Sequence, residues 1–143
     1  MSALILVGVI VMIFLFSNKK TDEEKSKTMV EEYNSIIENY NYAMGLTVDE
    51  LENCYGSDST ELNVSFLRDL ISYGGTFVYA IKDINNDGID ELIFSDKDSI
   101  VDMYTFDTET LKTIRFFEDE ELGYRTRLHI LSDGNLMLEG SSS

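Results

Sequence analysis

The sequence predicts an α+β protein, and three observations support this fold class. Residues 1–18 contain an unbroken apolar run, residues 19–75 repeat apolar side chains at steps of three and four, and residues 76–143 alternate apolar with polar side chains. A period near 3.6 is typical of amphipathic helices and a period of two is typical of strands. We therefore expect an N-terminal membrane helix and amphipathic helices, followed by an antiparallel β-meander that packs with the helices as one domain.

The N-terminal segment is apolar or glycine at every position from Ala3 to Phe16. A cleaved signal peptide would need basic residues before this run and a small-residue cleavage site after it, and the sequence has neither. A lipoprotein-type cysteine directly after the run is also missing from the sequence. We predict an uncleaved membrane anchor over residues 1–18. Lys19 and Lys20 follow the run, and the positive-inside rule taken alone would place the rest of the chain in the cytoplasm.

The first helix candidate covers residues 21–46. Thr21 followed three positions later by Glu24 matches a capping box, and Gly45 is a candidate helix stop. One apolar stripe runs along this segment, formed by Met29, Tyr33, Ile36, Ile37, Tyr40 and Met44.

Two shorter helix candidates follow, over residues 47–56 and 59–75. The first has a second capping box, Thr47 with Glu50, and both end in glycine. The predicted buried side of the second consists of Leu62, Phe66, Leu67, Leu70 and Tyr73.

Six strands with short connections are expected in the C-terminal half, which would make an antiparallel meander. The small polar turn at residues 107–110 and the Asp133-Gly134 pair are typical of hairpin turns. The predicted strands cover residues 76–84, 91–95, 99–106, 111–118, 123–131 and 135–141.

The formal net charge of −16 makes a nucleic-acid partner unfavourable, because phosphate groups would be repelled. The single cysteine, Cys54, cannot form an internal disulfide, and we interpret it as a small buried hydrophobic residue rather than a nucleophile. The single histidine, His129, is distant from it in the sequence.

The stretch KDINNDGIDELIFSD, residues 82–96, holds the candidate site. Oxygen-bearing side chains at alternate positions of a tight loop can converge on a cation, and Gly88 permits the sharp turn that such a loop needs. A calcium ion takes six to eight oxygen ligands, and backbone carbonyls can supply some of them. The predicted ligands are the side chains of Asp83, Asn85, Asp87 and Glu91 and the carbonyl group of Ile89.

A metal-free hairpin turn is the alternative, because Asn, Asp and Gly favour turns without any ion. That alternative explains residues 86–88. It does not explain why Asp83 and Glu91 stand at the first and ninth positions of the loop, where a calcium loop has ligands. An EF-hand is disfavoured, because its twelfth position needs a glutamate and here holds Phe94, and because the flanks read as strands. Magnesium suits the loop less well than calcium, since it keeps its own waters and few protein ligands.

The motif DINNDGIDELIF resembles the calcium loop of FG-GAP/integrin-alpha and related surface β-repeats, whose pattern is D-x-[DN]-x-D-G-x-x-D before an apolar strand. The resemblance covers about 20 residues. Because the motif occurs only once in the chain, a closed propeller is excluded. It implies Asp83, Asn85 and Asp87 as side-chain ligands, Ile89 as carbonyl ligand, and Glu91 in place of the usual aspartate. The longer phrase YAIKDINNDGIDELIF is similar to single-copy modules in uncharacterised surface proteins and lipoproteins of Gram-positive bacteria.

Three further groups of residues are weaker candidates. Arg125, Arg127 and His129 alternate along one predicted strand, where they could bind an anion or simply pair with neighbouring carboxylates. The acidic run at residues 118–122 reads as a solvated turn rather than a catalytic pair. Residues 95–99, SDKDS, read either as a turn or as a source of a further carboxylate near the ion.

These patterns favour a non-catalytic protein: a calcium-stabilised module that is anchored in a bacterial membrane, lies outside the cell and binds a protein or glycan. The sequence has no glycine-rich phosphate loop and no paired zinc ligands. The alternatives are an accessory domain of a hydrolase, using the carboxylates at 118–121, and an inhibitor or immunity-type surface protein whose acidic face covers a basic enzyme.

Overall fold

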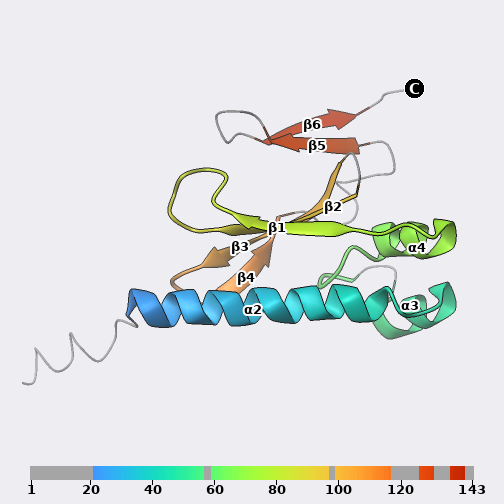
Figure 1. Ribbon diagram of the computed structural model, residues 1–143, viewed down its shortest axis with the longest axis horizontal. Coiled ribbons are helices and arrows are strands. Elements are labelled where there is room, and N and C mark those ends of the chain that lie inside the picture. The colour runs from blue at the N-terminus through green and yellow to red at the C-terminus, as the bar shows by residue number, and fades with distance from the viewer. Residues whose placement is uncertain (1–20, 57–58, 97–98, 117–125, 131–135, 141–143) are drawn as a thin grey trace, which may run out of the picture.

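The computed structural model describes residues 21–56, 59–96 and 99–116, together with the backbone of two further strands. It confirms an α+β fold with an antiparallel sheet, and Figure 1 shows the longest helix running along one side of that sheet. The helices are α2 (Asp22–Ala43), α3 (Val48–Tyr55) and α4 (Val64–Tyr73). The strands are β1 (Val78–Lys82), β2 (Glu91–Ser95), β3 (Ile100–Asp107), β4 (Lys112–Arg115), β5 (Thr126–Ile130) and β6 (Leu136–Gly140).

Both predicted capping boxes form. The Thr21 side chain accepts a hydrogen bond from the backbone of Glu24, whose carboxylate accepts one in return, and Thr47 and Glu50 repeat this arrangement at α3. These bonds satisfy backbone N–H groups that have no partner inside the helix, so α2 and α3 begin where the sequence predicts.

The helix ends differ from the prediction in two places. Helix α2 stops at Ala43, before the predicted end at residue 46; Met44 is its C-cap in a right-handed conformation, and Gly45, the predicted stop, follows the cap directly. Helix α4 begins at Val64 rather than near residue 59, because the Asn63 side chain accepts a hydrogen bond from the N–H of Phe66 and caps the helix there.

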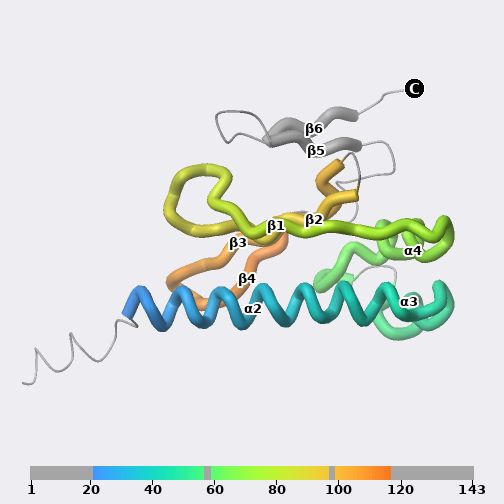
Figure 2. The backbone as a smooth tube through the Cα atoms, viewed as in Figure 1, coloured from blue at the N-terminus to red at the C-terminus, as the bar shows by residue number. Residues whose placement is uncertain are grey.

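The first four strands form the predicted meander. Strand β1 pairs with β2, β2 with β3 and β3 with β4, all antiparallel. The expected order breaks at β5, which pairs with β3 at Ile100 and Leu128 instead of with β4. Strand β4 pairs only with the half of β3 from Tyr104 onward. The other half of the same edge of β3 is therefore available to pair with β5. Figure 2 shows β1 to β4 on one side of α2, with α3 and α4 near the C-terminal end of that helix.

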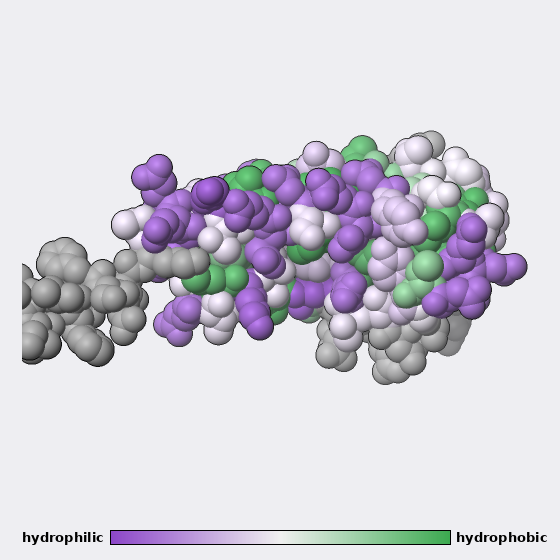
Figure 3. All heavy atoms as spheres, turned by 90° about the horizontal axis from the view of Figure 1, so that it is seen from below, coloured by the Kyte–Doolittle hydropathy of each residue, from purple (hydrophilic) through white to green (hydrophobic). Residues whose placement is uncertain are grey.

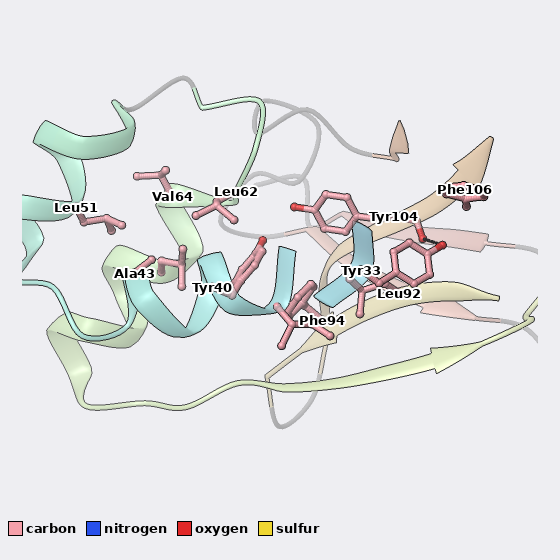
Figure 4. Close-up of a cluster of buried hydrophobic side chains, with 12 residues drawn as sticks. Tyr33, Tyr40, Ala43, Leu51, Leu62, Val64, Leu92, Phe94, Tyr104 and Phe106 are labelled. Carbon is pink, nitrogen blue, oxygen red and sulfur yellow. Dashed lines mark hydrogen bonds between the residues drawn. The ribbon is translucent and has the colours of Figure 1, made fainter. Parts of the chain in front are cut away.

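The main core lies between α2 and the sheet. Phe94 of β2 is fully buried, and its ring stacks on that of Tyr40 with centroids 4.0 Å apart. Figure 4 shows these two side chains next to each other in the core. Most of the predicted stripe of α2 faces this core, which confirms its period. The buried members of the core are Tyr33, Ile37, Tyr40, Ala43, Leu51, Leu62, Val64, Leu67, Leu92, Phe94, Tyr104 and Phe106.

Alternation along β2 sends Ile93 to the opposite face of the sheet from Leu92 and Phe94. There Ile93 joins a smaller buried cluster with Ile84 and Met103.

Two burial predictions are wrong. Tyr73 is 82% exposed, because α4 ends there and the chain turns away at the left-handed Gly74. Cys54 is exposed: it lies in the last turn of α3, where the helix ends, although it is only three positions after Leu51, the buried residue of that helix. The outer face of the molecule along α2 is mostly hydrophilic with scattered apolar side chains (Figure 3).

Within the ranges described above, no helix is long and apolar enough to cross a membrane. The predicted anchor, residues 1–18, lies outside the described residues.

Candidate calcium loop

The candidate site is the loop of residues 83–90, which joins β1 to β2. The register of the hairpin pairs Lys82 with Glu91, so the two strands meet directly at the base of the loop. Two residues of the loop have positive φ angles, Asn86 at 60° and Gly88 at 87°. Asparagine and glycine are the residues that adopt this conformation at least cost, which explains why the loop can turn sharply here.

The predicted side-chain ligands curl the loop by accepting hydrogen bonds from its backbone. Asp83 Oδ2 accepts from the N–H of Gly88 at 2.9 Å, and Asp87 Oδ1 accepts from the N–H of Ile89 at 2.8 Å. Asn85 Oδ1 accepts from the N–H of Asp87 at 3.0 Å, while its Nδ2 donates to Asp87 Oδ2 at 2.9 Å. These hydrogen bonds link the three side chains to the backbone of one turn.

The second oxygen of Asp83, Oδ1, is buried and lacks a hydrogen-bond partner among the described residues. A buried carboxylate oxygen without a partner is costly, because it has lost its water and gained nothing in return. A hard cation would satisfy it, and oxygen is the ligand that calcium prefers. This atom is the structural observation that best fits the predicted ion.

Glu91 lies at the base of the loop and is fully buried. Its Oε2 accepts from the N–H of Ile84 at 3.0 Å and its Oε1 accepts from the hydroxyl of Thr105 at 3.3 Å. Burial raises the pKa of the Glu91 carboxyl; Asp87 and Asp83 raise it further, whereas the two hydrogen bonds oppose the shift. A cation near this carboxylate would remove the penalty that burial and like charge impose.

The carboxylates are held by separate hydrogen bonds rather than gathered around one point. Across the described part of the chain, no three His, Cys, Asp or Glu side chains lie close enough together to hold a metal ion. A calcium site here would therefore draw also on the amide of Asn85 and the carbonyl of Ile89, and the loop would tighten on binding.

A helix residue contacts this loop. The Tyr33 hydroxyl, on α2, donates to the carbonyl oxygen of Asp90 at 2.7 Å, and only 1% of Tyr33 is exposed. Burial raises the pKa of the Tyr33 hydroxyl, and the nearby Glu91, Asp90 and Asp87 raise it further, so the hydroxyl keeps its proton. The sequence identified Tyr33 only as part of an apolar stripe, although a buried tyrosine generally needs a partner for its hydroxyl.

A second polar cluster, centred on Asp102, was missed by the sequence analysis. Asp102 is fully buried on the helix-facing side of β3 and accepts from the hydroxyl of Tyr40 on α2. Arg115 on β4 donates through Nε to both carboxylate oxygens at 2.9 Å, and the Tyr104 hydroxyl lies 3.0 Å from Oδ2. The cluster ties α2, β3 and β4 together, and its burial indicates a structural role. The only signal in the sequence is an aspartate inside the apolar run IVDMYTF.

Residues 118–122 and Arg125 lie outside the described residues, and for Arg127 and His129 only the backbone of β5 is described. In the SDKDS segment, Asp96 Oδ1 accepts from the N–H of Ser99 at 2.8 Å, as expected for a turn.

Comparison with known proteins adds no relative: no family model, curated protein or solved structure matches the chain. The resemblance to FG-GAP/integrin-alpha loops therefore stays a prediction from the sequence.

Proposed function

We propose that this chain is a non-catalytic, calcium-stabilised module that is anchored in a bacterial membrane, lies outside the cell and binds a protein or glycan partner. The observation that carries the calcium proposal is the buried Oδ1 of Asp83, which has no hydrogen-bond partner among the described residues and lies in a loop with the spacing of a cation cage. In this proposal Asp83, Asn85, Asp87 and Glu91 supply side-chain oxygens and Ile89 its carbonyl. The ion stabilises the first hairpin and performs no bond-breaking step.

The extracellular location follows from the availability of the ion. Extracellular modules bind calcium with dissociation constants of about 10⁻⁴ to 10⁻³ M, and cytosolic calcium is too scarce to fill a site of that strength. We therefore place the domain outside, against the indication of Lys19 and Lys20.

The partner-binding part of the proposal is supported by β1. This strand is an edge of the described sheet, and all five of its residues are exposed. Val78, Tyr79 and Ile81 are 63%, 50% and 45% exposed. An exposed apolar edge strand can add an extended segment of another chain, which favours a polypeptide over a glycan as the partner.

Calcium at about 1 mM should stabilise the full chain in detergent by about 1.4 kcal/mol, if the dissociation constant is about 10⁻⁴ M. Asp87→Ala should lose most of this increment while changing stability little in chelator, because it removes a ligand but also some repulsion from Asp83 and Glu91. Paired melting curves of parent and variant, each with calcium and with chelator, measure both effects. An equal gap between parent and variant in the two buffers would mean that the loop is a metal-free hairpin.

Protease added to intact cells should degrade the domain if it lies outside the membrane. The anchor should remain in the membrane fraction, because an uncleaved apolar segment is not released with the soluble fragments. Immunoblotting with antibodies against the domain reads out the result. A domain that resists protease until the cells are lysed would show that the positive-inside rule predicted the orientation correctly.

A further inference from the structure

We infer that Tyr33 couples helix α2 to the loop of residues 83–90, so that calcium binding at the loop tightens the contact of this helix with the sheet. The inference rests on the proposed calcium site and adds a means of regulation to it.

The first step is the contact itself. Tyr33 and Asp90 are 57 positions apart, yet the Tyr33 hydroxyl donates to the Asp90 carbonyl oxygen at 2.7 Å, and only 1% of Tyr33 is exposed. The same hydroxyl lies 3.5 Å from the carbonyl oxygen of Tyr104 on β3. The middle of α2 is thus fastened to the end of the loop by a directional bond as well as by apolar packing.

The second step is the position of Asp90 between two proposed ligands. Ile89 would offer its carbonyl to the ion and Glu91 its carboxylate, so the peptide groups on both sides of Asp90 must be oriented when calcium binds. The hydroxyl of Tyr33 already fixes the carbonyl of Asp90. Because planar peptide groups leave only two soft torsions at each residue, fixing this carbonyl restricts the orientation of its neighbours.

The third step is reciprocity. If the bond from Tyr33 holds the loop in the orientation that calcium requires, then bound calcium must in turn favour the docked position of α2 by the same factor. Helix α2 begins at Asp22, only a few residues after the predicted anchor, so calcium at the loop would stabilise the element that connects the domain to the membrane.

Calorimetric calcium titration of the full chain in detergent tests the coupling. Tyr33→Phe keeps the ring in the core and removes only the hydroxyl, and we expect it to weaken calcium affinity about five-fold or more. Tyr40→Phe is the matched control: it lies on the same helix, is fully buried, and donates to Asp102 instead of to the loop. The control should lower the melting temperature but leave the calcium dissociation constant unchanged within about two-fold.

Hydrogen exchange gives an independent readout. Saturating calcium should slow exchange of the α2 amides around Tyr33 several-fold in the parent and in Tyr40→Phe, and much less in Tyr33→Phe. Calcium binding with equal affinity and equal exchange in parent and Tyr33→Phe would overturn the coupling and leave the calcium site intact. If the parent itself does not bind calcium, both the proposed site and the coupling are wrong.

Discussion

Replacing Asp102 with alanine should lower the free energy of unfolding by about 3–5 kcal/mol. The substitution removes the carboxylate to which Arg115 Nε donates, and the side chain of Arg115 is only 9% exposed. The hydroxyl of Tyr40 loses its acceptor in the same step, and buried polar groups without partners are costly. Urea denaturation of parent and variant, followed by circular dichroism, measures the difference.

The matched control is the exposed ion pair between Arg68 and Glu52, whose side chains are 46% and 49% exposed. Glu52→Ala also removes one carboxylate from an arginine, but solvent screens this pair, and the change should stay below about 1 kcal/mol. If Asp102→Ala costs no more than Glu52→Ala, the buried cluster does not hold α2, β3 and β4 together.

Replacing Glu91 with alanine should cost about 2–4 kcal/mol in millimolar calcium, counting an unsatisfied buried donor and the lost calcium increment. The donor is the N–H of Ile84, from which Glu91 Oε2 accepts a hydrogen bond in the parent. In chelator the cost should be smaller, because removing the carboxylate also removes a buried charge repelled by Asp87 and Asp83. Glu91→Gln retains an acceptor for Ile84, so it should lose only the calcium increment. A glutamine variant that keeps the full increment would exclude Glu91 as a ligand.

The same carboxylate predicts the pH dependence of stability in chelator. Burial raises the pKa of Glu91 in the folded state, so the folded protein holds this proton more tightly than the unfolded chain does. Its contribution is therefore fully present below the unfolded pKa and is lost as the pH rises through the raised folded pKa. Subtracting the stability curve of Glu91→Gln from that of the parent isolates this contribution. A difference that grows with increasing pH in chelator would contradict the assignment.

Local patterns made much of the fold predictable. The capping boxes at Thr21 and Thr47 involve residues three positions apart, so the start of α2 and of α3 depends on neighbours in the sequence. The apolar stripe of α2 and the alternation of β2 depend only on the periods of helix and strand. The tight turn of the candidate loop was likewise predictable, because Asn86 and Gly88 take the positive φ angles that their residue types tolerate.

Contacts between distant segments decided the rest. The exposure of Tyr73 and Cys54 depends on which helix faces meet the sheet, and periodicity alone does not determine this for short helices. The pairing of β5 with β3 depends on how much of the edge of β3 the short strand β4 covers.

The sequence by itself determined the α+β class, the start of α2 and α3 and the five candidate calcium ligands, because each of these is a property of residues a few positions apart. Only the tertiary structure decided that Asp102 would be buried against Arg115, that Tyr33 would reach the carbonyl of Asp90, and that one oxygen of Asp83 would be left buried without a described partner. The physical reason is that a polar group inside a core must find its partner in space, and the partner can lie on any element that the fold brings alongside.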